Sequence, residues 1–486
     1  MSNNDGRNFD IPEILKEKDV PKKKSKKNIV IGIITVAFSL LVLASVLITV
    51  FNKVEIAGET YKLNTNSVYI RDYEFKAEDI EAITKLNSVT YIQFTNCTFP
   101  EDDLSWIPET VKEIKLNNCN LTDEHIESID FKSVGFTSIN IDNNKGITDL
   151  SSLSDAGDNL TSLSFCGCSV KDISFVSAME NLLSLYFDSN NVEDISVLSA
   201  CTRLQIVSFN SNKVKNIDSL SSCSNLSQVS FSSNQIENLN GLKNATKLKN
   251  INADDNNISD ISGLKDATRL DTVSIKNYNG ASLDISYLEK SAGTITELIL
   301  DGAVIDDLSP IGKMINLNKI SINNSSSIKS LEFLSNCTAV EFVSVSNTAL
   351  ESLSGIENLK DLYDLDVSGC KLTSVDLSSV LADNPIDLNF SNNNISSLIL
   401  PELTKLRTLE IYGNPLSDID ISQLKGIRIV MSYHNGFDYS SLIDAFSLCC
   451  VIDCPEDKQA EIIGLSDSFT VMSEEEYLLS EKEEGN

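Results

Sequence analysis

The chain has very few of the side chains from which most catalytic sites are built. Its 486 residues include only two histidines, His125 and His434, and a single tryptophan. No Ser-His-Asp or Cys-His arrangement can therefore be assigned with any support. Neither G-x-x-x-x-G-K-[S/T] nor G-x-G-x-x-G occurs, so the common nucleotide-binding loops are also missing. We predict that the chain is not an enzyme and needs no cofactor.

Proline, glycine and positive charge are also scarce. The 9 prolines and 20 glycines argue against a collagen-like or linker-rich chain, whereas 41% hydrophobic residues favour a folded one. Lysine and arginine number 39 against 70 acidic residues, and residues 1–28 alone carry a charge of +3. The remainder is strongly acidic and repels the phosphates of nucleic acid. This charge suits a cationic partner, or it simply keeps a long chain soluble.

A long uncharged segment lies near the N-terminus. Residues 29–51 contain no charged side chain, and the segment Pro21-Lys-Lys-Lys-Ser-Lys-Lys27 precedes them. At about 1.5 Å per residue such a helix crosses a hydrocarbon core of about 30 Å. A cleaved signal peptide would have a shorter apolar region and a small-residue cleavage site. We therefore predict a transmembrane signal-anchor with residues 1–28 in the cytoplasm and the rest of the chain outside the cell.

The rest of the chain repeats a short unit. Leu182, Leu204, Leu226, Leu248 and Leu270 are each 22 residues apart. A typical unit, from Leu226 to Leu242, reads L-x-x-V-x-F-x-x-N-x-I-x-x-L-x-x-L. This pattern resembles the leucine-rich-repeat family over residues 67–427. Its 22-residue unit, with Asp-Ile-Ser in the turn, is most similar to the bacterial internalin class.

The repeat predicts a curved, mostly β solenoid of the α/β repeat type. We index each unit by the apolar residue that opens its strand, position 0, and sixteen such residues run from Val68 to Leu409. Alternation along a strand points positions 0 and +2 inward and positions +1 and +3 outward. Stacked units then form a parallel concave sheet. Only about a dozen residues return on the convex side, so turns and short 3₁₀ segments are expected there.

Position +5 is predicted to form a structural ladder between units. A buried amide offers two donors and an acceptor for backbone groups that the turn leaves free. The position carries asparagine in seven units and cysteine in four: Asn144, Asn190, Asn212, Asn234, Asn256, Asn393 and Asn414, and Cys97, Cys119, Cys168 and Cys370. The family pattern accepts either residue.

The eleven cysteines do not predict a disulfide framework. Besides the four at position +5, Cys201, Cys223 and Cys337 share a convex-side position where other units have alanine. We expect these seven to be free, buried thiols. Cys449, Cys450 and Cys454 would need His434 to complete a zinc site, and no C-x-x-C pair is present. A strand near the C-terminus is the favoured interpretation, and no metal is predicted.

The resemblance implies that the concave sheet binds the partner. The exposed columns are mostly serine, asparagine and aspartate, with few of the tyrosines that dominate binding energies. Such a face suits a basic protein segment or a glycan, although much of it could be solvated spacer. The predicted binding residues are Tyr186, Asp188, Asp142, Asn210, Asp254 and Tyr412.

The ends of the solenoid complete the predicted organisation. Residues 52–66 are expected to form a linker and N-terminal cap, residues 428–472 a small α/β cap, and residues 473–486 an acidic disordered tail. The whole predicts a membrane-anchored extracellular protein that binds protein or glycan at the cell surface. The alternative is a structural or sensory module that docks onto another membrane protein.

Overall fold

The computed structural model describes residues 52–484, apart from residues 158, 279, 379, 381–386, 401–404, 417, 421–425, 435–436 and 444–445. The predicted tail and anchor, residues 1–28 and 29–51, lie outside the described residues. Within the part that is described, no helix is both long enough and apolar enough to cross a membrane.

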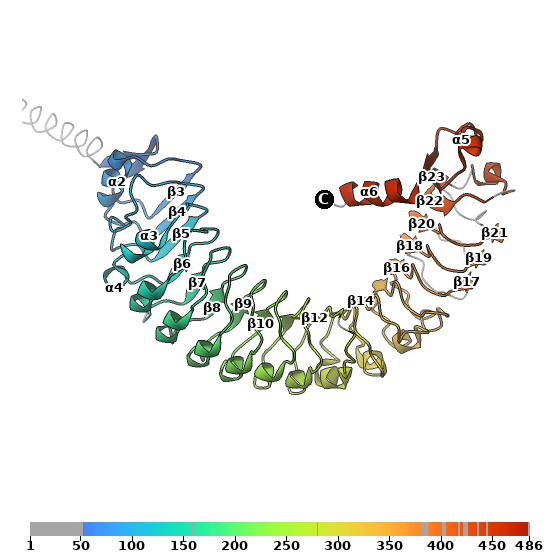
Figure 1. The fold of residues 1–486 in the computed structure, drawn as a ribbon, viewed down its shortest axis with the longest axis horizontal. Helices are drawn as coiled ribbons and strands as arrows, with labels where there is room; N and C mark the ends of the chain where they lie inside the picture. The colour runs from blue at the N-terminus through green and yellow to red at the C-terminus, as the bar shows by residue number, and fades with distance from the viewer. Residues whose placement is uncertain are drawn as a thin grey trace, which may run out of the picture.

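The described chain is an open horseshoe whose inner wall is one long parallel sheet (Figure 1). Each strand pairs in register with the next, for example Leu163 with Leu185, so equivalent residues of successive units form straight columns. The strands of the repeat region, in sheet order, are β3 (Ser67–Arg71), β4 (Tyr91–Thr95), β5 (Glu113–Asn117), β6 (Ser138–Asn140), β7 (Ser162–Ser164), β8 (Ser184–Tyr186), β9 (Ile206–Ser208), β10 (Gln228–Ser230), β11 (Asn250–Asn252), β12 (Thr272–Ser274), β13 (Glu297–Ile299), β14 (Lys319–Ser321), β15 (Phe342–Ser344), β16 (Asp364–Asp366), β18 (Asp387–Asn389) and β20 (Thr408–Glu410).

The core runs as a continuous apolar column through the horseshoe. Positions 0 and +2 point into it, as the period-two alternation requires. At position +2 four phenylalanines stack in succession, Phe165, Phe187, Phe209 and Phe231, with ring centroids 5.4–5.7 Å apart. Each unit thus buries its apolar face only against its neighbours, which is how a repeat array extends without a central core.

Short helices return the chain on the convex side. The middle units use 3₁₀ helices: η1 (Ser151–Ala156), η2 (Ser174–Ala178), η3 (Ser196–Ala200), η4 (Asp218–Ser222), η5 (Asn240–Leu242), η6 (Ser262–Leu264), η7 (Ile285–Ser291), η8 (Ile311–Lys313) and η9 (Glu332–Leu334). The first units are longer and hold α-helical turns instead: α2 (Ala77–Thr84), α3 (Asp123–Glu127) and α4 (Phe131–Val134). The expected turn and 3₁₀ convex side therefore holds from η1 to η9.

The last units replace this helical return by a second parallel sheet. It consists of β17 (Ser374–Asp376), β19 (Ser397–Ile399) and β21 (Asp418–Asp420). Val375 and Leu377 are both buried, as are Leu398 and Leu400. Apolar residues two apart favour a strand, whereas the middle units space theirs three apart and favour a helical turn.

Both ends of the solenoid are covered. A hairpin of β1 (Lys53–Ile56) and β2 (Glu59–Lys62) precedes β3. At the other end the main sheet continues in parallel through β22 (Ile427–Ser432), β23 (Phe446–Ile452) and β24 (Phe469–Met472), with η10 (Tyr439–Leu442) and α5 (Glu456–Ile463) between them.

The prediction of a disordered acidic tail from residue 473 is wrong. Helix α6 (Glu474–Glu484) follows β24 and projects into the hollow of the horseshoe (Figure 1). Its Tyr477 side chain is only 2% exposed. One buried aromatic residue, with partners far away in sequence, orders a segment whose composition alone is typical of disorder.

Candidate binding face

The concave face presents three columns of side chains to the hollow, at positions −1, +1 and +3 of each unit. Behind them, position +5 turns back into the solenoid. There Asn190 donates from Nδ2 to the carbonyl oxygens of Phe165 and Phe187, at 2.9 and 3.0 Å. Its Oδ1 accepts from the backbone nitrogen of Val170 at 3.0 Å. Each such amide therefore joins two successive units by hydrogen bonds that the strands do not make.

The same pattern recurs at the other asparagines of position +5. All seven are buried, and each donates to the position +2 carbonyl of its own unit and of the preceding unit: Asn144, Asn190, Asn212, Asn234, Asn256, Asn393 and Asn414. At Cys168 and Cys370 the sulfur takes the amide's place, 3.5 and 3.2 Å from the carbonyl oxygens of Ile141 and Val345 in the preceding units.

A second ladder, which sequence reasoning missed, runs along the concave face at position +3. Asp188 Oδ1 accepts from the hydroxyl of Ser208 at 2.7 Å and from the backbone nitrogen of Asn210 at 2.6 Å, both in the next unit. Asn210 in turn accepts from Ser230 Oγ and from the Ser232 nitrogen, at 2.8 and 2.7 Å. From β6 to β20 the strands of the main sheet end at position +1, so these side chains satisfy a backbone N–H that has no strand partner.

Four of the six predicted binding residues belong to this ladder. Asp142 and Asp254 accept the same pair of bonds as Asp188 and Asn210, from the serine hydroxyl at +1 and the backbone nitrogen at +3 of the next unit. One oxygen of each side chain is therefore committed to holding the units together. These residues are first of all structural. The amide nitrogen of Asn210 also donates to Ser208 Oγ at 3.0 Å, and the second oxygen of Asp254 lies 3.7 Å from the Lys276 ammonium.

The predicted residues do not form one site. Asp142, Tyr186, Asp188 and Asn210 lie in the consecutive units of β6 to β9, with Tyr186 half-buried. Asp254 lies two strands beyond β9.

The sixth predicted binding residue, Tyr412, is not exposed on the concave face. It belongs to the unit of β20, far along the arc, and is only 6% exposed. The ring of Tyr477 in α6 covers it, edge to face, with ring centroids 5.7 Å apart.

An aromatic patch occupies the N-terminal end of the concave face. Tyr69 on β3 is 58% exposed, and its ring centroid lies 5.2 Å from that of Tyr91 on β4. The Tyr91 hydroxyl donates to Gln93 Oε1 at 2.7 Å, and the Lys115 ammonium lies 5.9 Å from the same ring. Such a pair of rings provides the kind of flat apolar surface on which ligands stack.

An acidic patch lies toward the opposite end, on β16 and β18. Asp364 pairs across strands with Asp387, and Asp366 lies on the same strand. Burial, followed by the charges of Asp387 and Asp366, raises the pKa of Asp364 to about 6. The rings of Phe342 and Tyr363 lie beside it, with centroids 5.5 Å apart.

The residues at position −1 could have predicted this acidic patch from the sequence. Asp364 and Asp387 occupy that position, and the sequence prediction weighed the columns at +1 and +3 only. Arg407 pairs with Asp387 at 3.3 Å, and the Asp366 carboxylate accepts from the backbone nitrogen of Ser368. The patch therefore combines clustered, partly desolvated carboxylates with two aromatic rings.

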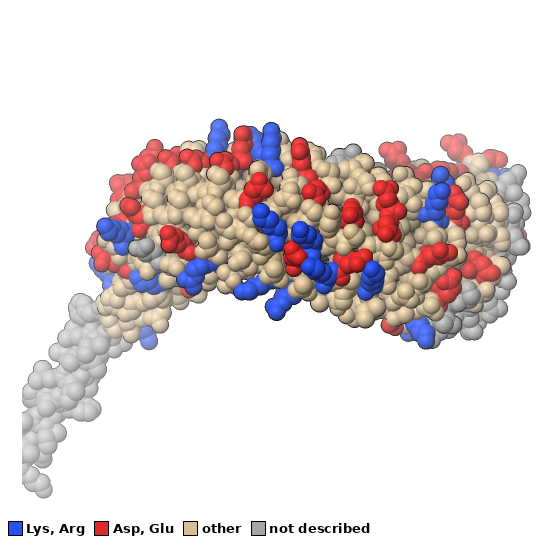
Figure 2. Space-filling model, turned by 90° about the horizontal axis from the view of Figure 1, so that it is seen from below, with Lys and Arg blue, Asp and Glu red and all other residues tan. Residues whose placement is uncertain are grey.

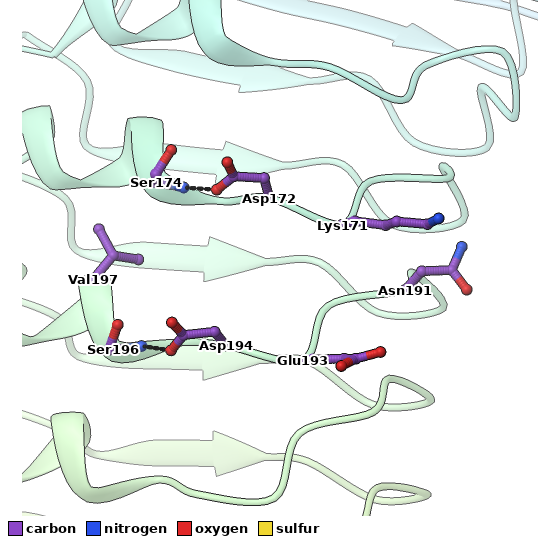
Figure 3. Close-up of a pocket in the computed structure, with 8 residues that line it drawn as sticks. All are labelled: Lys171, Asp172, Ser174, Asn191, Glu193, Asp194, Ser196 and Val197. Atoms are coloured by element: carbon purple, nitrogen blue, oxygen red, sulfur yellow. Dashed lines mark hydrogen bonds between the residues drawn. The ribbon is translucent and has the colours of Figure 1, made fainter.

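The flank of the horseshoe has shallow grooves that serve the fold. One, of about 500 Å³, lies between two successive units (Figure 3). Its Asp172 and Asp194 each accept from the backbone nitrogen two residues later, at 2.8 Å, and so stabilise the turns that lead into the 3₁₀ helices η2 and η3. These are the Asp-Ile-Ser turns of the sequence, and their carboxylates are already occupied.

The convex face carries both signs of charge. Acidic side chains follow one edge of it and its ends, and lysine and arginine side chains gather nearer the middle, with acidic ones among them (Figure 2). Within the described ranges no group of three or more histidine, cysteine or acidic residues could hold a metal ion. The convex face therefore offers less to a charged partner than the two ends of the concave face.

All eleven cysteines are free, and ten of them are buried. Cys166, at position +3, is the partly exposed one, and burial together with Asp142 and Asp188 raises its pKa to about 12. Cys449 and Cys450 lie on β23, where Cys449 faces the main core and Cys450 faces α6. The cluster near the C-terminus is therefore built into a strand.

Comparisons with known proteins agree with this geometry. A model of the BspA-type leucine-rich-repeat region matches six copies, over residues 143–259 and 315–439. A leucine-rich-repeat protein of Leptospira interrogans superposes with a TM-score of 0.60 at 18% identity, covering 75% of this chain and 90% of that one. Among curated proteins no match is found.

Two Listeria monocytogenes proteins are also similar. The functional domain of InlJ, which includes a cysteine ladder, superposes with a TM-score of 0.53 at 18% identity and covers 77% of each chain. The internalin InlF gives a TM-score of 0.49 at 20% identity, covering 71% of this chain and 90% of that one. At these identities the likeness concerns the fold.

The chain thus carries leucine-rich repeats, which the BspA-type model matches over residues 143–259 and 315–439, and its fold is like that of the Leptospira protein and of InlJ. Leucine-rich-repeat proteins of this kind are binding proteins without enzymatic activity, which agrees with the prediction from the scarcity of catalytic residues. Leucine-rich-repeat domains bind proteins.

Proposed function

We propose that this chain is a membrane-anchored protein of the cell surface whose concave face binds a protein partner through a basic segment. The observation that carries the proposal is the acidic patch formed by Asp364, Asp366 and Asp387, beside the rings of Phe342 and Tyr363. Carboxylates already crowded and partly desolvated gain most from an incoming cation. The neighbouring rings supply apolar contact area at low entropic cost.

The anchor in this proposal is the uncharged segment of residues 29–51. The lysine cluster before it favours a cytoplasmic N-terminus, and the repeats would then lie outside. A repeat domain that stands on one helix reaches partners on other cells or in the medium. The same arrangement also permits the alternative, in which the solenoid docks onto a second membrane protein. Residues 1–28 would then transmit that contact to a partner in the cytoplasm.

Topology is tested by protease treatment of intact cells that express the full chain with a C-terminal tag. Loss of the tagged domain without lysis supports an outside solenoid. Full protection in intact cells, with digestion after lysis, would place the repeats inside and overturn the surface role.

Binding is tested by a photo-cross-linking residue at position 363, next to the acidic patch, in the full chain on intact cells. The proposal predicts one dominant protein adduct, which weakens at high salt because exposed charge pairs are screened. The double change Asp364→Asn and Asp387→Asn should abolish the adduct.

The matched control removes two charges from the flank. Glu193 and Glu237 are exposed side chains outside the concave columns, so Glu193→Gln with Glu237→Gln should leave the adduct unchanged. Equal loss in both double variants would mean that only net charge matters, and an absent adduct would remove the acidic patch as a binding site.

A glycan is the second candidate ligand, and the aromatic patch favours it. Tyr69 and Tyr91 form an exposed pair of rings next to the amide of Gln93 and the ammonium of Lys115. Binding of the chain to a panel of polysaccharides, compared between the native chain and Tyr69→Ala, tests this candidate. Binding that does not depend on Tyr69 would reject the patch as a glycan site.

A further inference from the structure

One end of the concave face is apolar where the rest is polar. Tyr412, just beyond the end of β20, lies together with Val430 on β22 and with Cys450 and Ile452 on β23. None of the four is more than 6% exposed. We call these four residues the C-terminal apolar patch. They occupy positions +1 and +3, which carry serine, asparagine and aspartate in most other units. Their burial depends on α6, which lies over them.

Helix α6 holds the patch by few contacts. The Tyr477 ring packs against Tyr412, and its hydroxyl donates to Glu410 Oε1 at 2.8 Å. One turn later, Glu481 pairs with the guanidinium of Arg428 at 2.7 Å, and that guanidinium lies 5.6 Å from the Tyr477 ring. A tyrosine and a glutamate four residues apart are therefore the recognition elements, since they lie on one side of the helix.

The other side chains of α6 are not those expected of a permanently packed helix. Leu478 and Leu479 are 45% and 55% exposed, although a permanently packed helix would bury its leucines. The helix begins with three glutamates and projects into the hollow (Figure 1). Burial and then the charge of Glu481 raise the pKa of Glu410, and Asp366 adds to the same effect. Acidic groups of α6 and of the concave strands therefore oppose one another.

We infer that the C-terminal apolar patch is a second binding surface, which α6 covers reversibly and which a helical segment of a partner protein occupies in its place. The occupant carries a tyrosine followed four residues later by a glutamate, as α6 does, on an otherwise basic helix. The tyrosine and glutamate repeat the observed contacts with Glu410 and Arg428. Basic residues elsewhere on the helix face Asp366 and Glu410 and remove the repulsion that α6 suffers.

Release of α6 is tested by alkylation of the native full chain, read residue by residue by mass spectrometry. Cys450 lies under Tyr477, whereas its neighbour Cys449 faces the main core and serves as an internal control. We expect Tyr477→Ala to speed the labelling of Cys450 at least about tenfold with Cys449 unchanged, because labelling follows the open population. Leu479→Ala, on the exposed side of the same helix, should leave both rates within about twofold.

Two results would overturn the inference at this stage. If Cys450 stays protected in the Tyr477→Ala chain, α6 does not control access to the patch. If Cys449 and Cys450 become reactive together, α6 is a structural cap whose loss unfolds the last strands.

Occupation by a second helix is tested with three peptides added to the Tyr477→Ala chain. The first has the sequence of residues 474–484, the second is the same with Glu475→Lys and Glu484→Lys, and the third adds Tyr477→Ala to the second. We expect the first two peptides to slow the labelling of Cys450, the basic one at lower concentration, and the third to have no effect. Protection by all three peptides, or by none, would reject the C-terminal apolar patch as a site for such a helix. The adduct at position 363 is measured separately, so loss of this inference does not reject the proposed function.

Discussion

Replacing Asn234 by alanine removes one amide from the middle of the ladder at position +5. The asparagine is 8% exposed, so its backbone partners have little access to water. Its Nδ2 donates to the carbonyl oxygens of Phe209 and Phe231, each at 3.0 Å, and its Oδ1 accepts from the nitrogen of Val214 at 2.9 Å. The substitution therefore removes three bonds of 3.0 Å or less to backbone groups in two units, besides a longer bond from Nδ2 to the Ser232 oxygen at 3.2 Å.

The loss of these bonds does not cost the same free energy at each of the three backbone groups. Each of the two carbonyl oxygens also accepts from a neighbouring ladder amide and keeps that bond. The Val214 N–H loses the acceptor that Asn234 provides. An orphaned buried group costs about 1–3 kcal/mol and a lost shared bond about 0.5–1.5 kcal/mol. We therefore expect Asn234→Ala to destabilise the surrounding units by about 3 kcal/mol.

Asn234→Cys separates the two contributions. Cysteine occupies the same position in other units, where Cys168 lies 3.5 Å from the corresponding carbonyl. A thiol can keep a weak bond to the carbonyl but is a poor acceptor for Val214 N–H. The expected loss is then about 2 kcal/mol, dominated by the orphaned N–H. Gln235→Ala, an exposed neighbour, should change stability by less than about 0.5 kcal/mol.

Hydrogen exchange measured by mass spectrometry is the suitable assay, because a long repeat array need not unfold in one step. Protection should fall in the units of β9 and β10 and stay unchanged around β4. A loss below about 1 kcal/mol for the alanine variant would refute the assignment of the N–H as the costly group. Equal losses for alanine and cysteine would refute the role of the sulfur.

Three further perturbations follow from other contacts. Gly241→Ala should cost about 3 kcal/mol by hydrogen exchange, because its Cβ would lie 1.9 Å from the Ile217 oxygen, whereas Gly293→Ala meets nothing within 4 Å and should be nearly neutral. Asp188→Ala should cost about 1–2 kcal/mol by the same measurement, and Asp188→Asn should restore most of it because an amide oxygen still accepts. Asp364 has a raised pKa of about 6, so its carboxylate opposes folding increasingly as pH rises from about 4 to 6. Asp364→Asn should therefore stabilise by about 1 kcal/mol at pH 7, after allowance for solvent screening, and by nothing at pH 3.5 in denaturant titrations.

The repeat predicts the fold because its periodicity is physical. An apolar residue at 0 and +2 and an amide at +5 can serve every unit only if the units stack in register, and the observed pairing of Leu163 with Leu185 is of this kind. The second convex sheet could also be predicted from the sequence. Val375 and Leu377 are apolar residues two apart, whereas other units space their leucines three apart. That signal was present but was not used.

The face and the tail were harder to predict. The sequence pattern identifies the side chains that point outward, but it does not show that the chain leaves the strand after position +1. Asp188 therefore accepts from a backbone N–H in the next unit, which the pattern did not predict. Composition cannot tell that Tyr477 meets Glu410 and Arg428, which lie about 50 to 70 residues earlier in the chain. In both cases the deciding partner is a tertiary contact that no local pattern records.

The ladders also determine where binding specificity can vary. Positions +3 and +5 carry bonds between units, and a change at either position costs stability before it affects a ligand. Position −1 takes no part in either ladder among the described residues, and it holds residues as different as Ile206, Glu297, Phe342 and Asp364. Variation at position −1 can therefore alter recognition at little cost to the fold. Substitutions that change binding without changing hydrogen exchange should concentrate there, at residues such as Asp364 and Asp387 of the acidic patch.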